Sequence, residues 1–196
     1  MPVVAALLHG LNPMPFVKLW KLKRDLLLAL VAAAAVIFFG VLDGMLIAVA
    51  LSIALLIQRL AHPRVAKLGR LAGSHDFVDV IRHSDAQQIP SVSIYRPSVP
   101  LLFANADTIF HYIENEVMTQ KQLKAVIVSL EESADLDSTS YEVIAAFDTA
   151  MKKAGKKLQL ARVHDQVRDV LLAGRLDSLV GRCSYSVDDA VAAVMN

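Results

Sequence analysis

A short run of acidic and hydroxyl residues near the middle of the chain has the clearest potential for chemistry. Asp137 is followed by Ser138 and Thr139, just before an amphipathic stretch with helical spacing. A phosphate on either hydroxyl would add about 1.5 to 2 negative charges at a helix start, which would abolish docking onto a partner. The run is therefore a candidate phosphorylation switch.

The same residues also fit a purely structural role. Thr139 and Glu142 have the spacing of a capping box, in which the hydroxyl satisfies free amides of the first helical turn. Such a cap contributes roughly 1 kcal/mol to stability. The two roles are compatible, and the sequence leaves both open.

Other residue types that support catalysis or metal binding are not arranged for it. Cys183 is the single cysteine, which excludes an intrachain disulfide, and it is predicted to be a small strand or core residue. The six histidines lack the spacing that places two metal ligands on one face. The chain has no glycine-rich phosphate loop and no GxSxG motif. We therefore expect no metal, no cofactor and no enzymatic activity.

The first structural element along the chain is a long apolar segment. Residues 26–57 carry one charge, Asp43, and as one straight helix they would measure about 48 Å against a hydrocarbon core of about 30 Å. Gly40 and Gly44 bracket Asp43, a composition that can turn the chain and keep a carboxylate at the far interface. We predict a transmembrane helical hairpin over residues 26–61 with its turn at these three residues. The two glycines also fit a helix-packing motif.

Charge patterning predicts the orientation of this hairpin. Residues 1–89 carry nine Lys+Arg against five Asp+Glu, and residues 90–196 carry eleven against fourteen. Basic residues flank the apolar segment on both sides, so both of its ends are expected in the cytoplasm of a multi-pass inner-membrane protein. They form no stripe interleaved with aromatic residues, which argues against nucleic acid as a partner. Residues 1–25 are predicted to be the end of another transmembrane helix and an interfacial connector that includes Phe16 and Trp20.

The second half of the chain alternates between strand and helix patterns. Residues 62–88 are interpreted as a linker with one short strand at Phe77–Val80, and residues 89–196 as the domain proper. The alternation predicts an α/β domain with packed helices on a mixed, largely parallel sheet of four to five strands. The predicted strands lie at residues 91–96, 124–130 and 157–163, with helical stripes between them and a further short strand at residues 181–186. Ser186 and Asp189 form a capping box for a last helix.

These segments in this order resemble a STAS domain, the module shared by SulP-type sulfate permeases and anti-sigma factor antagonists. LLFANA at Leu101–Ala106 is similar to the L-x-FANA motif of the SulP branch, and HPRVAKLGRL at His62–Leu71 is similar to its junction between helix and linker. The resemblance makes Phe103 and Asn105 candidate helix-start and interaction residues. It also implies that Ser138 is the phosphate acceptor, although this chain has Asp137, Ser138, Thr139 and Ser140 where the family commonly has DxSG.

The resemblance covers nearly the whole chain and implies the C-terminal part of a SulP anion permease, a secondary transporter. We expect the last transmembrane helices and a cytoplasmic STAS domain that regulates transport and does not transport alone. The expected partners are membrane lipid, a transporter core or a second copy of the chain, and a regulatory protein. The alternative is a membrane-tethered, partner-switching regulator similar to anti-sigma factor antagonists.

Overall fold

The computed structural model describes residues 23–61 and 63–195 of the chain. The chain divides into two compact units, Met1–Gln58 and Arg59–Asn196, which we describe one at a time. The predicted transmembrane helix end and interfacial connector, with Phe16 and Trp20, lie mainly in residues 1–22, outside the described residues.

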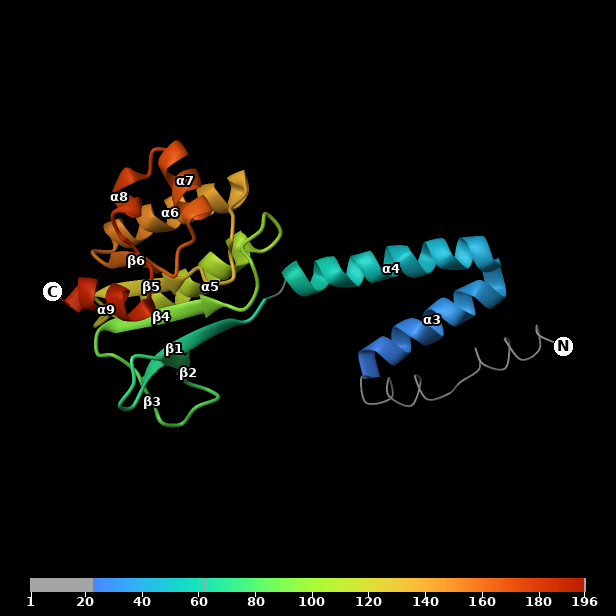
Figure 1. The fold of residues 1–196 in the computed structure, drawn as a ribbon, viewed down its shortest axis with the longest axis horizontal. Helices are drawn as coiled ribbons and strands as arrows, with labels where there is room; N and C mark the ends of the chain where they lie inside the picture. The colour runs from blue at the N-terminus through green and yellow to red at the C-terminus, as the bar shows by residue number, and fades with distance from the viewer. Residues whose placement is uncertain (1–22, 62, 196) are drawn as a thin grey trace. The chain divides into compact units, whose positions relative to one another are not determined.

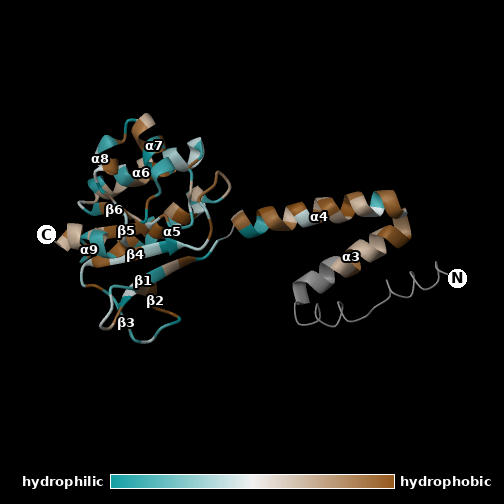
Figure 2. Cartoon of the chain, in the orientation of Figure 1, coloured by the Kyte–Doolittle hydropathy of each residue, from teal (hydrophilic) through white to brown (hydrophobic). Residues whose placement is uncertain are grey.

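The first unit contains two apolar helices, α3 (Lys23–Phe39) and all but the last three residues of α4 (Val41–Ala61). They meet at Gly40, whose φ of 85° is open to glycine and strained for other residues. Figure 1 shows them as two arms joined at one end, and Figure 2 shows hydrophobic residues along most of α4. Among the described residues, α4 is the one helix long and apolar enough to cross a membrane, while α3 holds a shorter apolar run at Ala29–Phe39.

The structure gives the three predicted turn residues different roles. Gly40 alone interrupts the helix, whereas Asp43 and Gly44 lie in the first turn of α4, with Asp43 exposed and Gly44 buried. A Cβ at Gly44 would lie 2.5 Å from the Cα of Val36, near the end of α3. The predicted turn is therefore one residue long, and the packing role considered for the glycine pair applies to Gly44.

Because Gly44 contacts the backbone of α3, we expect Gly44→Ala to weaken the helix pair. The added methyl group overpacks the contact and should cost about 1 kcal/mol. The measurement is the sodium dodecyl sulfate fraction at which the full chain, in mild detergent, loses half its helical circular dichroism. Ala50→Leu adds apolar volume on the exposed side of α4 and serves as control. Equal midpoints for the two variants would contradict the packing role.

The second unit is built on one sheet of seven strands in the order β2-β1-β4-β5-β6-β7, with β3 also paired to β1. β1 is antiparallel to β2, β3 and β4, whereas β4 through β7 are parallel to one another. The strands are β1 (Val65–Leu71), β2 (Phe77–Asp79), β3 (Ala86–Gln87), β4 (Val92–Pro97), β5 (Ala125–Ser129), β6 (Lys157–Ala161) and β7 (Cys183–Ser184). The helices are α5 (Ala106–Thr119), α6 (Ser138–Lys153), α7 (Asp165–Ala173), α8 (Asp177–Val180) and α9 (Val187–Met195).

Helices cover both faces of this sheet, which explains why its central strand β5 is buried at every position and apolar from Ala125 to Val128. Val126 and Val128 of β5 pack in the core formed with α5, α6, α7 and α8, and Ile127 packs in the core formed with α9. In Figure 1, α6, α7 and α8 lie on one side of the sheet and α9 on the other. The predicted fold class, an α/β domain with a mixed sheet preceded by apolar helices, is confirmed.

The structure differs from the sequence interpretation in the segment 62–88. This segment was predicted to be a linker with one strand at Phe77–Val80, but it supplies β1, β2 and β3, and the sheet begins at Val65. The sheet is accordingly larger than the four to five strands predicted. Helix α3 begins at Lys23, three residues before the hairpin predicted over residues 26–61, whereas α4 ends at Ala61, where the predicted hairpin ends.

Candidate functional site

Two loops that carry separate candidate residues are joined by hydrogen bonds. The backbone N–H of Leu101 donates to Ser133 Oγ at 3.0 Å, and the N–H of Phe103 donates to Asp137 Oδ2 at 2.6 Å. The loop between β4 and α5 is thereby held against the loop between β5 and α6. The structure thus brings together Phe103 and the predicted switch residues.

Asp137 is the residue that caps α6. Its Oδ1 accepts a hydrogen bond from the backbone N–H of Ser140 at 2.7 Å, while its Oδ2 accepts the bond from Phe103. Burial by itself raises the pKa of the Asp137 carboxyl, but the backbone bonds from Ser140 and Phe103 outweigh it, so the pKa lies below the usual value. The cap is therefore Asp137 and not the predicted capping box of Thr139 with Glu142.

Ser138 and Thr139 occupy the first turn of α6, and both side chains are exposed. Phe103, linked to Asp137 through its amide, is 73% exposed, which is unusual for a large aromatic residue. We call Phe103, Ser138 and Thr139 the Phe103 face. An exposed aromatic beside two accessible hydroxyls suits a protein contact that a charge could switch off.

Asn105 organises the loop that carries Phe103. It is 1% exposed, its Oδ1 accepts from the N–H of Leu102 at 2.9 Å, and its Nδ2 donates to the carbonyls of Pro100 and Leu60, each at 3.0 Å. Its side chain makes no capping bond to α5. Asn105 thus precedes the start of α5, as predicted, but its side chain contacts loop carbonyls and does not cap the helix.

The comparisons with known proteins bear on this arrangement. The protein-family model described as the STAS domain matches residues 83–190, more than half of the chain. The chain belongs to the STAS-domain family. Its STAS domain therefore carries the two joined loops and the Phe103 face.

Sequence relatives extend this similarity to the apolar helices. The chain is 33% identical over 182 residues to a probable sulfate transporter of Mycobacterium tuberculosis, covering 91% of this chain and 32% of the relative. It is 30% identical over 202 residues to the high affinity sulfate transporter 2 of Stylosanthes hamata, covering 97% of this chain and 30% of the relative. The chain thus spans about a third of the length of these relatives, consistent with the C-terminal part of a SulP-family transporter.

Solved structures agree on the fold. The murine solute carrier 26 family member A9 anion transporter, in the inward-facing state, matches 92% of this chain with a TM-score of 0.82 at 21% identity, and the match covers 30% of that chain. A putative anti-sigma factor antagonist of Thermotoga maritima matches 55% of this chain with a TM-score of 0.50 at 22% identity, and the match covers 91% of that chain. The STAS fold is thus similar both to a transporter and to an antagonist.

The STAS domain also contains polar groups that sequence patterns did not reveal. Asp148 on α6 is 2% exposed and forms a two-pronged ion pair with Arg182, at 2.7 and 2.9 Å. Nothing in the sequence signals this pair, because its members are 34 residues apart. Three arginines, Arg64, Arg82 and Arg96, gather near the start of β1.

Cys183 lies in β7 and is half-buried. Burial raises the pKa of the Cys183 thiol to about 11, despite the nearby Arg168 and Arg182, so the thiol is protonated at neutral pH. Among the described side chains, those of residues 29–61 and 63–195, no group of three His, Cys, Asp or Glu residues could hold a metal ion.

Proposed function

We propose that this chain is the membrane-anchored C-terminal part of a SulP-type anion transporter, and that its STAS domain regulates transport through protein contacts. The supporting observation is the similarity to a sulfate transporter over 91% of the chain. A likeness limited to residues 83–190 would fit any STAS protein, whereas one that includes the apolar helices fits a transporter. The proposed substrate class of the whole transporter is sulfate or a related anion.

The chain spans about a third of the length of its transporter relatives, so we propose that the transport path lies in a permease core outside these residues. Contacts to this core, or to a second copy of the chain, would involve the apolar helices and the STAS domain. We place the STAS domain in the cytoplasm, with α3 and α4 as two membrane crossings, because basic residues flank both helices. A reporter enzyme that is active only in the cytoplasm should therefore be active when it is fused after Asn196.

Copurification tests the proposal. The full chain, tagged and extracted from native membranes in mild detergent, should bring down a permease core identified by mass spectrometry. The chain expressed alone in cells that lack sulfate uptake should not restore uptake, whereas the chain together with the captured core should. Sulfate uptake by the chain alone, or fractionation of the chain without the membrane, would overturn the proposal.

One structural feature favours a second candidate, a membrane-tethered partner-switching regulator. Ser138 is exposed at the start of α6, where a phosphate would meet the positive end of the helix and alter the Phe103 face. The same copurification distinguishes the two candidates, since a kinase-like anti-sigma factor in place of a permease core would support the regulator.

A charge on the Phe103 face should weaken partner binding in either case. We expect Ser138→Asp to lower the affinity for the captured partner by about tenfold or more, equivalent to about 1.4 kcal/mol. Affinity is measured by biolayer interferometry with the full chain in detergent. Ser178→Asp, which adds the same charge on the exposed surface of α8, should have no effect. Unchanged binding by Ser138→Asp, together with no phosphate on Ser138 or Thr139 in cell-derived protein, would refute the switch.

A further inference from the structure

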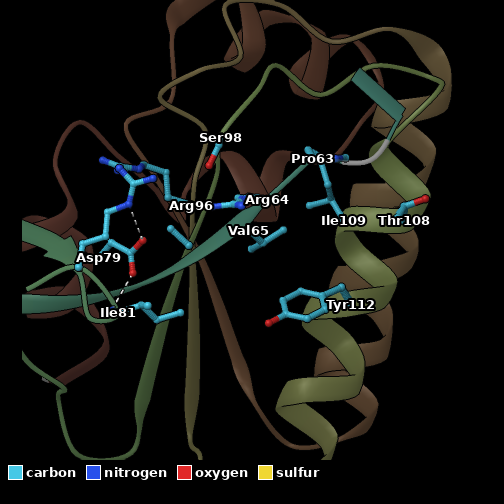
Figure 3. A pocket seen from close by; sticks show the side chains of 12 residues that line it. Pro63, Arg64, Val65, Asp79, Ile81, Arg96, Ser98, Thr108, Ile109 and Tyr112 are labelled. Atoms are coloured by element: carbon cyan, nitrogen blue, oxygen red, sulfur yellow. Dashed lines mark hydrogen bonds and ion pairs between the residues drawn. The ribbon is translucent and has the colours of Figure 1, made fainter. Parts of the chain in front are cut away.

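A hollow of about 720 Å³ opens beside the first residues of β1 in the STAS domain. Figure 3 shows its lining side chains, which come from the start of β1, the end of β4, helix α5 and the turn after β2. This volume lies in the range of small-molecule sites, about 300 to 1,000 Å³. The Phe103 face does not contribute to it, and of the two joined loops only Ser98, at the start of the loop between β4 and α5, lines it.

The hollow exists because β2 leaves the sheet early. The last bond between the two strands runs from the N–H of Val80 to the carbonyl of Lys67. The chain then turns, and Asp79 holds the turn by accepting a bond from the N–H of Ile81 at 2.9 Å. The edge of β1 at Val65 and Ala66 is therefore not covered by β2, and side chains from both faces of the sheet reach the opening.

Three arginines line the hollow, namely Arg64, Arg82 and Arg96, and Asp79 is the one residue with a carboxylate among the lining residues. The pairs made by two of them are long: Arg82 to Asp79 is 3.9 Å, and Arg96 to Glu131 is 3.8 Å. Among residues 29–61 and 63–195, whose side chains the structure describes, no carboxylate forms an ion pair with Arg64. With three arginines and one aspartate, the site has an excess of positive charge. The planar guanidinium groups of the arginines also match the oxygens of a phosphate group.

The remaining lining is apolar. Val65, Ile109 and Tyr112 lie together on one side of the arginines in Figure 3, and Ile81 stands at the lip, 88% exposed. An inorganic anion gains nothing from such walls. An amphiphile with a phosphate group and a hydrocarbon part would satisfy both the arginines and the apolar side chains.

Chain connectivity keeps this hollow near the end of α4. Arg64 follows the last residue of α4, Ala61, by three positions, which limits their separation to about 11 Å even if the chain is fully extended. If α4 crosses the membrane, as the proposed function requires, lipid head groups at its end are within reach of Arg64. Anionic head groups attract basic residues at this depth.

We propose that the hollow binds the phosphate head group of an anionic phospholipid. Arg64 and Arg96 hold the phosphate oxygens, Arg82 closes the side toward the β2 turn, and Ile81 and Tyr112 contact the glycerol and upper acyl carbons. The site would tie the STAS domain to the leaflet from which α4 emerges. This inference rests on the membrane anchoring in the proposed function.

The test is a titration of the purified full chain in neutral detergent, with thermal unfolding as readout. The probes are dioctanoyl phosphatidylglycerol, dioctanoyl phosphatidylcholine and inorganic phosphate. We expect phosphatidylglycerol to raise the unfolding temperature saturably, because a ligand that binds the folded state stabilises it, while the other two have no such effect. Arg64→Gln/Arg96→Gln should weaken the apparent phosphatidylglycerol affinity by about tenfold or more. Lys153→Gln/Lys157→Gln removes two exposed charges elsewhere and should leave the affinity unchanged.

Two other outcomes would overturn the proposal of a lipid site. An equal, arginine-dependent shift with inorganic phosphate would identify a site for a soluble anion. An equal loss in both double variants would show a nonspecific effect of net charge. The arginine variant should still fractionate with the membrane and copurify with the permease core, so loss of lipid binding alone leaves the proposed function standing. Failure of the wild-type chain to fractionate with the membrane would instead refute the proposed function.

Discussion

Asp148→Ala is expected to lower the free energy of unfolding of the STAS domain by about 3 kcal/mol. Removing one partner of a buried ion pair costs about 3 to 5 kcal/mol, and the lower figure applies because Arg182 keeps 26% of its side chain exposed. Asp148 also accepts a bond from Lys152 at 2.7 Å. Since small domains are stable by about 5 to 15 kcal/mol in total, the loss is a large fraction.

The size of this effect follows from what Arg182 connects. Besides Asp148 on α6, its guanidinium donates to the carbonyls of Leu158 on β6 and Ser178 on α8. Without the carboxylate, a partly buried guanidinium loses its counter-charge, and the segment between α8 and β7 loses its link to α6. Burial raises the pKa of Asp148, but the bonds from Arg182 and Lys152 lower it below the usual value, so the pair is intact at neutral pH.

Pulse proteolysis of the full chain in detergent, across a urea series, measures this loss. With a slope of about 1 to 3 kcal/mol per molar urea, the midpoint should fall by about 1 to 3 M. Asp169→Ala removes an exposed aspartate from α7 and should shift stability by less than about 0.5 kcal/mol. A midpoint for Asp148→Ala equal to that of this control would mean that the ion pair does not stabilise the domain.

The parallel part of the sheet could be predicted because its strands and helices carry local patterns. The run at residues 125–128 is apolar throughout, as β5 requires with helices on both faces. The capping box also proved correct, since Ser186 Oγ accepts from the N–H of Asp189 at 3.0 Å at the start of α9. In each case the residues that determine the structure are close together in the chain.

Strands β1 to β3 lacked such a pattern. Polar residues and a glycine interrupt β1, and β3 is two residues long, so only pairing with distant residues defines these strands. Gly69 was a usable signal, because a glycine within a strand often marks close approach of another backbone. A Cβ there would lie 2.9 Å from the carbonyl oxygen of Gln87 on β3.

The residues of the candidate site were named from the sequence, but the hydrogen bonds that they form were not predicted. Ser138 and Thr139 are exposed at a helix start, as a switch requires, yet the cap was assigned to Thr139 with Glu142. The capping bond of Asp137 to Ser140 is local and was open to prediction, but its second bond comes from Phe103, 34 residues away. Helix capping depends on residues that are close together in the chain, whereas the hydrogen bond from Phe103 to the Asp137 carboxylate depends on the fold.

Asp137→Ala should reduce the stability of the STAS domain by about 2 kcal/mol, because the helix loses its cap and the N–H of Phe103 loses its acceptor. The pKa of Asp137 is lowered by folding, so its contribution is fully present above the unfolded value, 3.8, and is lost as pH falls through the folded pKa. The variant should therefore lose less stability than the wild type upon acidification below about pH 4.

Two readouts distinguish this role from a general defect. Urea midpoints of the full chain at pH 7 and pH 3 give the stability and its acid dependence, and amide hydrogen exchange at Phe103 reports on the bond between the loops. Ser138→Ala removes an exposed hydroxyl beside Asp137 and should change neither. Asp137→Asn retains one carbonyl oxygen for two donors, so it should lose about half as much stability as Asp137→Ala and, like it, lack the acid dependence from this site. Exchange at Phe103 as slow in Asp137→Ala as in the wild type would show that the carboxylate does not hold the two loops together.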